Sequence, residues 1–199
     1  MPDIDVLLFP ELFTTGYQMD IINKIAHHDD DPLFGRFRLF AKDHQVAILL
    51  GSIASWQKNG VYNRSYVIDK RGEIISNYAK VHLFSLMKEE QYLAAGETAH
   101  VFKLDDVILS SIICYDLRFP ELTRQLYIKY QPKVIFVPME WPAPRTEAFR
   151  TLLKARAVEN QCYVVSCNRV GEELGNVFEG HSLACDPYGN ILAECDDQE

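Results

Sequence analysis

The stretch from Val107 to Leu122 limits the possible folds more than any other part of the sequence. It begins with mostly β-branched or apolar residues and ends abruptly at Cys114, which predicts a buried strand with a thiol at its carboxyl end. Pro120 then favours the first turn of a helix, and Glu121 suits the positive end of that helix's dipole. We therefore expect Cys114 at a strand-to-helix turn of an α/β fold.

The position of this thiol allows two interpretations. Unpaired backbone N–H groups gather at a strand-to-helix turn, where they can stabilise a thiolate or bind an oxyanion. Free cysteines are also among the most buried residue types, however, and most of them only pack in the core. The position of Cys114 alone leaves both interpretations open.

The composition is typical of a globular protein with one well-buried core. The chain has 199 residues, 48% hydrophobic and 24% charged, and we expect a single α/β domain over residues 1–199. The net charge of −8 and the scattered Lys and Arg residues argue against a nucleic-acid partner and favour a small-molecule substrate. No apolar run reaches the roughly 18 residues of a membrane span. No cationic start precedes an apolar segment, so we expect a cytoplasmic protein.

The cysteines and histidines do not form a metal-binding pattern. The five cysteines include no C-x-x-C pair, and their odd number leaves at least one of them outside any disulfide scheme. Zinc needs three or four Cys or His ligands at short spacing, which the six histidines do not supply. We therefore expect a reducing compartment, no metal and no cofactor.

Local patterns predict strands that alternate with helices. We expect strands at residues 5–9, 46–55, 61–69, 74–79, 100–104, 107–113, 133–137, 162–168, 182–186 and 191–195. We expect helices that start at Asp31-Pro32, at Pro120 and at Thr146, with Thr146 as a cap. We expect a loop with a helical turn at 85–98 and a loop at 171–180. Asn59-Gly60 is a strong hairpin signal, so at least part of the sheet should be antiparallel or mixed.

Two ionisable residues lie at the ends of predicted strands. Glu11 follows a strand closed by Pro10 and lies in an apolar setting. Loss of water there favours the protonated form, so the Glu11 carboxylate can accept a proton near neutral pH. Lys80 follows the strand at 74–79. Base rates favour a solvated loop glutamate and a surface lysine. By spacing alone, Glu89 and Glu90 are a solvated charge run.

Four motifs occur in an order that makes them specific together. They are Leu8-Phe9-Pro10-Glu11-Leu12, Tyr78-Ala79-Lys80-Val81-His82-Leu83-Phe84, Cys114-Tyr115-Asp116-Leu117-Arg118-Phe119-Pro120-Glu121 and Ala155-Arg156-Ala157-Val158-Glu159-Asn160. Through them the chain resembles the nitrilase superfamily, the carbon-nitrogen hydrolases, over nearly its whole length. The resemblance implies an α-β-β-α sandwich with mixed sheets.

The resemblance also implies a set of catalytic residues. The family's nucleophile falls on Cys114, its general base on Glu11, its lysine on Lys80 and its second glutamate on Glu89, with Glu90 as the alternative. Amide hydrolysis by a thiol needs such a base, a donor for the oxyanion and an acid for the leaving ammonia. The oxyanion would lie between the Lys80 ammonium and the backbone N–H of Tyr115, and a thioester would form.

Within the superfamily, two segments look most like the omega-amidase branch. They are Met139-Glu140-Trp141-Pro142 and Glu159-Asn160-Gln161-Cys162-Tyr163-Val164-Val165. That branch cleaves terminal amides of short 2-oxo dicarboxylic acid monoamides, and its members suggest a homo-oligomer, a dimer. Trp141 would line the substrate site, and Arg118, Arg145 or Arg150 could hold the substrate carboxylate, because an arginine fork binds carboxylates bidentately. We expect Arg156 and Glu159 to form a structural ion pair.

Three alternatives stay open. The chain could be a nitrile or N-carbamoyl hydrolase of the same superfamily. It could use a Cys114/His82 dyad, since histidine has the better-matched pKa, although Glu11 and Lys80 would then be unexplained. It could also be a non-catalytic fragment that keeps the fold.

The chain departs from the family pattern at both ends. Family members have a further strand and helix before the strand of the general base and a further segment after the last strand, whereas this chain runs from Met1 to Glu199. We therefore expect a sandwich that is incomplete at both ends. The strand at Val6 to Phe9 would be an open edge that favours association.

Overall fold

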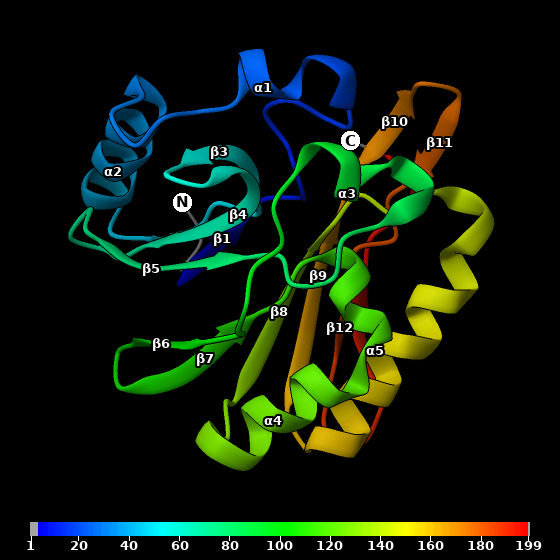
Figure 1. Cartoon of the computed structure of the whole chain (residues 1–199). Coiled ribbons are helices and arrows are strands. Elements are labelled where there is room, and N and C mark those ends of the chain that lie inside the picture. The colour runs from blue at the N-terminus through cyan, green and yellow to red at the C-terminus, as the bar shows by residue number, and fades with distance from the viewer. Residues whose placement is uncertain (1–3, 199) are drawn as a thin grey trace. The chain divides into compact units, whose positions relative to one another are not determined.

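The computed structural model describes residues 4–198. The chain divides into two compact units, one up to Thr98 and the other from Ala99 (Figure 1). Each unit contains its own sheet. The expected chain ends at Met1 and Glu199 lie outside the described residues.

The first unit is built on a five-stranded mixed sheet. Its strands are β1 (Val6–Leu8), β2 (Ala47–Leu49), β3 (Ile53–Gln57), β4 (Gly60–Ile68) and β5 (Ile74–Ala79). The order is β1-β2-β4-β3, with β5 also paired to β4, and only the β1–β2 pair is parallel. The prediction of a mixed sheet is confirmed, as is the hairpin at Asn59-Gly60, since Gln57 pairs with Gly60.

Two expectations about these strands are wrong. The predicted strand at 46–55 is two strands, because the chain bends at Gly51, which has a φ of +41°. A Cβ atom at Gly51 would lie 1.9 Å from the carbonyl oxygen of Pro10, so this close approach excludes any larger residue. The strand expected at residues 5–9 is also shorter than predicted, because β1 covers only Val6–Leu8; its residues are half-buried, and it pairs with β2 at the sheet edge.

Helix α2 (Pro32–His44) begins as its sequence predicts. The Asp31 carboxylate accepts a hydrogen bond of 2.8 Å from the backbone N–H of Leu33, and Pro32 occupies the first turn. The apolar face of α2 packs through Phe34 and Ala41 onto buried sheet residues that include Ile48. Before it come two short helices, η1 (Met19–Ile21) and α1 (Ile22–Ile25), and after β5 come η2 (Ser85–Met87) and α3 (Glu89–Tyr92).

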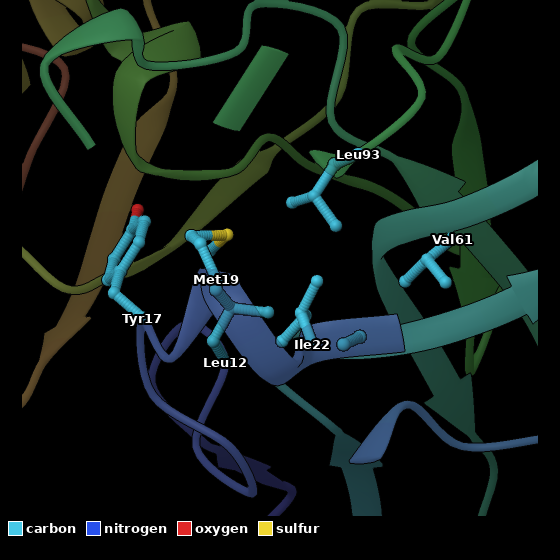
Figure 2. Packing of buried hydrophobic residues seen from close by; sticks show 7 residues of the cluster. Leu12, Tyr17, Met19, Ile22, Val61 and Leu93 are labelled. Atoms are coloured by element: carbon cyan, nitrogen blue, oxygen red, sulfur yellow. The ribbon is translucent and has the colours of Figure 1, made fainter. Parts of the chain in front are cut away.

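A second apolar cluster joins the loop after β1 to the segment after α3. Leu12, Tyr17, Met19 and Ile22 contribute side chains from the first segment, and Leu93 points toward them from the second (Figure 2). Val61 and Ala54 complete the cluster from the sheet. The cluster thus packs Leu12, which follows Glu11, together with Leu93, which follows the helix α3 that contains Glu89.

The second unit is built on a six-stranded mixed sheet. Its strands are β6 (Val101–Leu104), β7 (Val107–Ser111), β8 (Val134–Met139), β9 (Tyr163–Asn168), β12 (Leu183–Cys185) and β13 (Ile191–Glu194). Across the sheet they lie in the order β13-β12-β9-β8-β7-β6. The helices are η3 (Cys114–Arg118), α4 (Pro120–Tyr130), η4 (Ala143–Arg145) and α5 (Thr146–Asn160). Strands β7, β8 and β9 are parallel, and α5 packs against β9 and α4 (Figure 1).

Two local predictions fail in this unit. The predicted loop at 171–180 is a hairpin of β10 (Val170–Glu173) and β11 (Asn176–Glu179), closed by Leu174 and Gly175, which both have positive φ. That conformation is the favoured two-residue hairpin turn, although Leu174 is not a residue that predicts it. Thr146 is the first residue of α5 rather than its cap, and its hydroxyl donates to the carbonyl of Ala143.

No helix within residues 4–198 is long and apolar enough to cross a membrane.

Candidate active site

Three charged side chains from distant parts of the sequence meet inside the first unit. Glu11, Lys80 and Glu89 are 1%, 0% and 0% exposed, respectively. The Lys80 Nζ lies 2.8 Å from the Oε1 of Glu11, and it lies 2.9 Å from both carboxylate oxygens of Glu89. The base-rate alternatives of a solvated glutamate and a surface lysine are therefore wrong, and Glu11, Lys80 and Glu89 lie together.

The backbone around each member is fixed by hydrogen bonds. The N–H of Leu12, next to Glu11, donates to the Ser52 hydroxyl at 3.0 Å. Lys80 directly follows β5, and its own N–H donates to the carbonyl of Asn63 at 2.9 Å. The Lys80 carbonyl accepts from the N–H of Gly96, where a Cβ atom would lie 2.2 Å from the Ala79 carbonyl oxygen.

The two adjacent glutamates of α3 have opposite environments. Glu89 is buried, and its Oε2 accepts a 2.6 Å hydrogen bond from the backbone N–H of Phe84, whereas Glu90 is exposed. Burial raises the pKa of Glu89; Lys80 opposes this, and the charge of Glu11 adds to it. Glu89 is therefore the glutamate that contacts Lys80, and Glu90 is a solvated neighbour.

The charges of this cluster are not balanced one to one. Two carboxylates share one ammonium away from water, and an uncompensated buried charge is costly. Burial favours the neutral form of Glu89 and raises its pKa, whereas the Lys80 ammonium favours the charged form and opposes that rise. Such a cluster can accept a proton and return it during a reaction.

Asn63 on β4 is a fourth member of this cluster, and it was not among the residues predicted from the sequence. Its side chain is 0% exposed, and its Nδ2 donates to the Oε1 of Glu11 at 2.8 Å and to the Oε1 of Glu89 at 3.3 Å. The available signal was a polar residue at an inward-facing strand position, since buried polar groups need partners.

Cys114 lies in the second unit, at the first residue of η3, as the strand-to-helix prediction requires. The side chain is 5% exposed, and its backbone has a φ of +42°. Positive φ is uncommon for a residue other than glycine and costs conformational energy, and such residues cluster at functional sites. The Asp116 carboxylate accepts a 3.0 Å hydrogen bond from the N–H of Ile113, which holds the turn.

Three of the other thiols lie in environments that disfavour the thiolate. Burial raises the pKa of Cys162 to about 12 and that of Cys167 to about 11, and burial also raises the pKa of Cys185. None of the five cysteines, all of which lie within residues 4–198, forms a disulfide. Cys195 is exposed.

Arg118 is one turn of η3 beyond Cys114 and is held on aromatic faces. Its guanidinium lies 4.9 Å from the ring centroid of Trp141 and 6.0 Å from that of Tyr115. The side chain is exposed, and no carboxylate within residues 4–198 pairs with it. A guanidinium that is positioned by stacking keeps its donors available for an anion.

Trp141 is itself fixed on both sides. Its backbone N–H donates to the Oδ1 of Asn168 at 2.7 Å, and its indole N–H donates to the carbonyl of Arg145 at 3.0 Å. Arg145 thus supports Trp141 through its backbone.

The remaining predicted residues are in less suitable positions. Arg150 pairs with Glu194 at 2.6 Å, so it is already neutralised, and the predicted ion pair of Arg156 with Glu159 is present at 2.9 Å. His82 is half-buried in the segment after β5. Between residues 4 and 198, no group of three or more His, Cys, Asp or Glu residues could hold a metal ion.

Comparison with known proteins identifies the family. Residues 2–199 match the model of the carbon-nitrogen hydrolase family. The chain belongs to the carbon-nitrogen hydrolases. This membership confirms the expected superfamily and the expected class of enzyme.

Two curated relatives of this carbon-nitrogen hydrolase carry functional names. A protein of Bacillus subtilis (strain 168) named 2-oxoglutaramate amidase is 46% identical over 190 residues, which are 96% of this chain and 73% of that protein. The omega-amidase YafV of Escherichia coli (strain K12) is 34% identical over 194 residues, again 96% of this chain and 73% of the relative.

Solved structures confirm the expected fold class. The protein XC1258 of Xanthomonas campestris, described with an arsenic adduct in its active site, matches with a TM-score of 0.93 and 32% identity over 100% of this chain and 76% of the other. A cysteine-to-alanine mutant of the amidase from Nesterenkonia sp. AN1, in complex with butyramide, matches with a TM-score of 0.88 and 29% identity, covering 98% and 74%. This carbon-nitrogen hydrolase therefore has the nitrilase-like α/β fold.

Proposed function

We propose that this carbon-nitrogen hydrolase is an omega-amidase that converts a 2-oxo dicarboxylic acid monoamide to the 2-oxo acid and ammonia. The observation that carries the proposal is the buried cluster of Glu11, Lys80 and Glu89, which combines a proton acceptor with a cation. The substrate class is supported by the relatives named 2-oxoglutaramate amidase and omega-amidase.

Each catalytic residue has a separate role in this proposal. Glu11 removes the thiol proton of Cys114, whose sulfur attacks the amide carbonyl carbon. Lys80 and the backbone N–H of Tyr115 stabilise the oxyanion. The C–N bond then breaks, and ammonia leaves with the proton that Glu11 accepted.

The second half of the reaction uses the same groups in reverse. A water molecule gives a proton to Glu11 and attacks the thioester, which releases the acid and the Cys114 thiol. Glu89 holds Lys80 in place through both of its oxygens and keeps it charged.

Arg118 is the residue we assign to the substrate's carboxylate. It has the same turn of chain as Cys114, an aromatic support and no acidic partner among the described residues. Arg145 and Arg150 are weaker candidates for binding this carboxylate. Arg150 is already paired with Glu194, and the contact of Arg145 with Trp141 is made by its backbone carbonyl.

A substrate comparison tests this assignment. The unmodified enzyme should hydrolyse a 2-oxo acid monoamide about 10- to 100-fold better in kcat/KM than a neutral amide of equal length, because a charged hydrogen-bonded contact is worth about 1.5 to 3 kcal/mol. Arg118→Met should remove most of this preference, mainly through KM. The paired Arg150→Met is the matched control. Ammonia release measures all rates, and a better rate on a nitrile or an N-carbamoyl amino acid would refute the proposed substrate.

A second comparison separates the two candidate bases. Glu11→Gln keeps the shape of the side chain but removes the proton acceptor, so turnover should fall by a factor on the order of 10² or more. His82→Asn should leave turnover within a factor of about three, because His82 has no role in the proposed steps. The reverse ranking would favour the Cys114/His82 dyad. A wild-type chain that hydrolyses none of these compounds would favour the non-catalytic alternative.

Three expectations remain predictions. A single domain over residues 1–199, a homodimeric state and a cytoplasmic location are all consistent with the family and with five cysteines that form no disulfide. Light scattering on the purified chain measures the oligomeric state directly.

A further inference from the structure

The cluster of Glu11, Lys80 and Glu89 also contains a neutral hydrogen-bond donor, the Asn63 amide, which has no role in the proposed reaction steps. Asn63 lies in the middle of β4, where its neighbours on the same face are also buried. Its backbone carbonyl accepts the N–H of Lys80 at 2.9 Å. Its side chain and its backbone therefore contact the same charged cluster.

The Asn63 amide uses both of its N–H groups on the cluster. They point to the Oε1 of Glu11 and to the Oε1 of Glu89, and the Lys80 Nζ donates to the same two oxygens. Both Oε1 atoms are therefore acceptors. A proton carried by Glu11 must then reside on its Oε2.

The orientation of the amide follows from the charges around it. The Oδ1 of Asn63 is buried and accepts no hydrogen bond from any residue in the described part of the chain. Rotation of the amide by 180° would place this oxygen against two carboxylates. The structure therefore leaves one acceptor without a partner so that both donors can face negative charge.

We propose that Asn63 is a positioning residue that holds Glu11 and Glu89 on either side of the Lys80 ammonium and favours their ionised forms. The role in catalysis rests on the proposed function, in which Glu11 must be ionised to accept the thiol proton. The charged groups that contact the Asn63 side chain or its carboxylate partners are those of Glu11, Lys80 and Glu89, and the backbone N–H of Phe84 donates to the Oε2 of Glu89, the oxygen that Asn63 does not contact.

The sign of the expected pH effect follows from this contact. An N–H that donates to a carboxylate stabilises the ionised form, so its removal makes the carboxyl pair take up its proton at higher pH. Asn63→Ala should therefore move the acidic limb of the kcat/KM profile upward by about one pH unit, with kcat at neutral pH about tenfold lower. KM should change by less than about twofold.

Two further variants separate donation from packing. Asn63→Asp keeps nearly the same shape but replaces the donor by an acceptor, so it should be worse than Asn63→Ala; a packing role predicts the opposite order. Ser65→Ala is the matched control, because Ser65 is buried on the same strand and its hydroxyl has no partner among the described residues. It should have the wild-type profile.

A second readout keeps this inference separate from the proposed substrate. Infrared difference spectroscopy follows the carboxyl titration directly, and its assignment is checked by loss of the signal in Glu11→Gln. A shift of that titration to higher pH in Asn63→Ala supports the positioning role even if no amide is hydrolysed. An unshifted titration, or an equal effect of Ser65→Ala, would overturn it. Melting curves identify any variant that fails to fold, and Asn63→Ser, which retains one donor, then takes its place with an intermediate shift.

Discussion

Cys114→Ala should lower amide turnover by a factor on the order of 10⁴ or more, the largest kinetic effect expected of any substitution in this chain. In the proposed reaction the Cys114 sulfur forms the bond to the substrate, so no neighbouring group can replace it. Cys195→Ala, which removes an exposed thiol, should keep wild-type turnover. Ammonia release on a 2-oxo acid monoamide measures both variants.

The same thiol should be the fastest to react with iodoacetamide at neutral pH. Burial raises the pKa of Cys162 to about 12 and that of Cys167 to about 11, so almost no thiolate forms at these positions. Peptide mapping after brief labelling identifies the modified cysteines, and intact mass after exposure to substrate detects an acyl adduct. Labelling of Cys114 that is no faster than that of Cys162 would contradict its role as an activated nucleophile.

Most of the fold could be predicted because its signals are local. Asp31-Pro32 has a capping carboxylate and a helix-compatible proline, and Asn59-Gly60 has the residues that a tight hairpin requires. Two elements had no such signal. The break at Gly51 results from contact with Pro10, which is distant in sequence, and the β10–β11 turn contains a leucine at positive φ.

The candidate site shows the same division. Motif resemblance was sufficient to select Glu11, Lys80 and Cys114, but the environment of Glu89 depends on a fold that buries one glutamate of an adjacent pair. Asn63 belongs to none of the motifs, and its partners come from three other segments. Contacts between residues that are far apart in the sequence cannot be predicted from the spacing of residues along the chain.

Lys80→Met should destabilise the fold more than any other single substitution in the site. It removes the cation while two buried carboxylates remain, and breaking a buried ion pair costs about 3 to 5 kcal/mol. Because a domain has a free energy of unfolding of only about 5 to 15 kcal/mol, this is a large fraction of the total. Urea denaturation measures it, with the exposed Lys42→Met as the control.

Adding Glu89→Gln to Lys80→Met tests whether charge is the cause. The double variant has one fewer uncompensated carboxylate, so it should recover at least about half of the lost free energy of unfolding while it stays inactive. Equal stability of the single and double variants would show that the loss comes from packing around residue 80.

The pH dependence of Lys80→Met gives an independent check on this explanation. In the native chain burial already raises the pKa of Glu89 above its ordinary value, and Lys80 opposes that rise. Without Lys80 the folded pKa rises further, so the folded state keeps a proton that the unfolded state releases. Stability is then lost as the pH rises from the unfolded pKa of this carboxyl through its raised folded pKa, and it returns as the pH falls. Lys80→Met should therefore be more stable at about pH 5 than at about pH 8, by more than the wild type is, whereas a pH-independent deficit would exclude the buried carboxylates as its source.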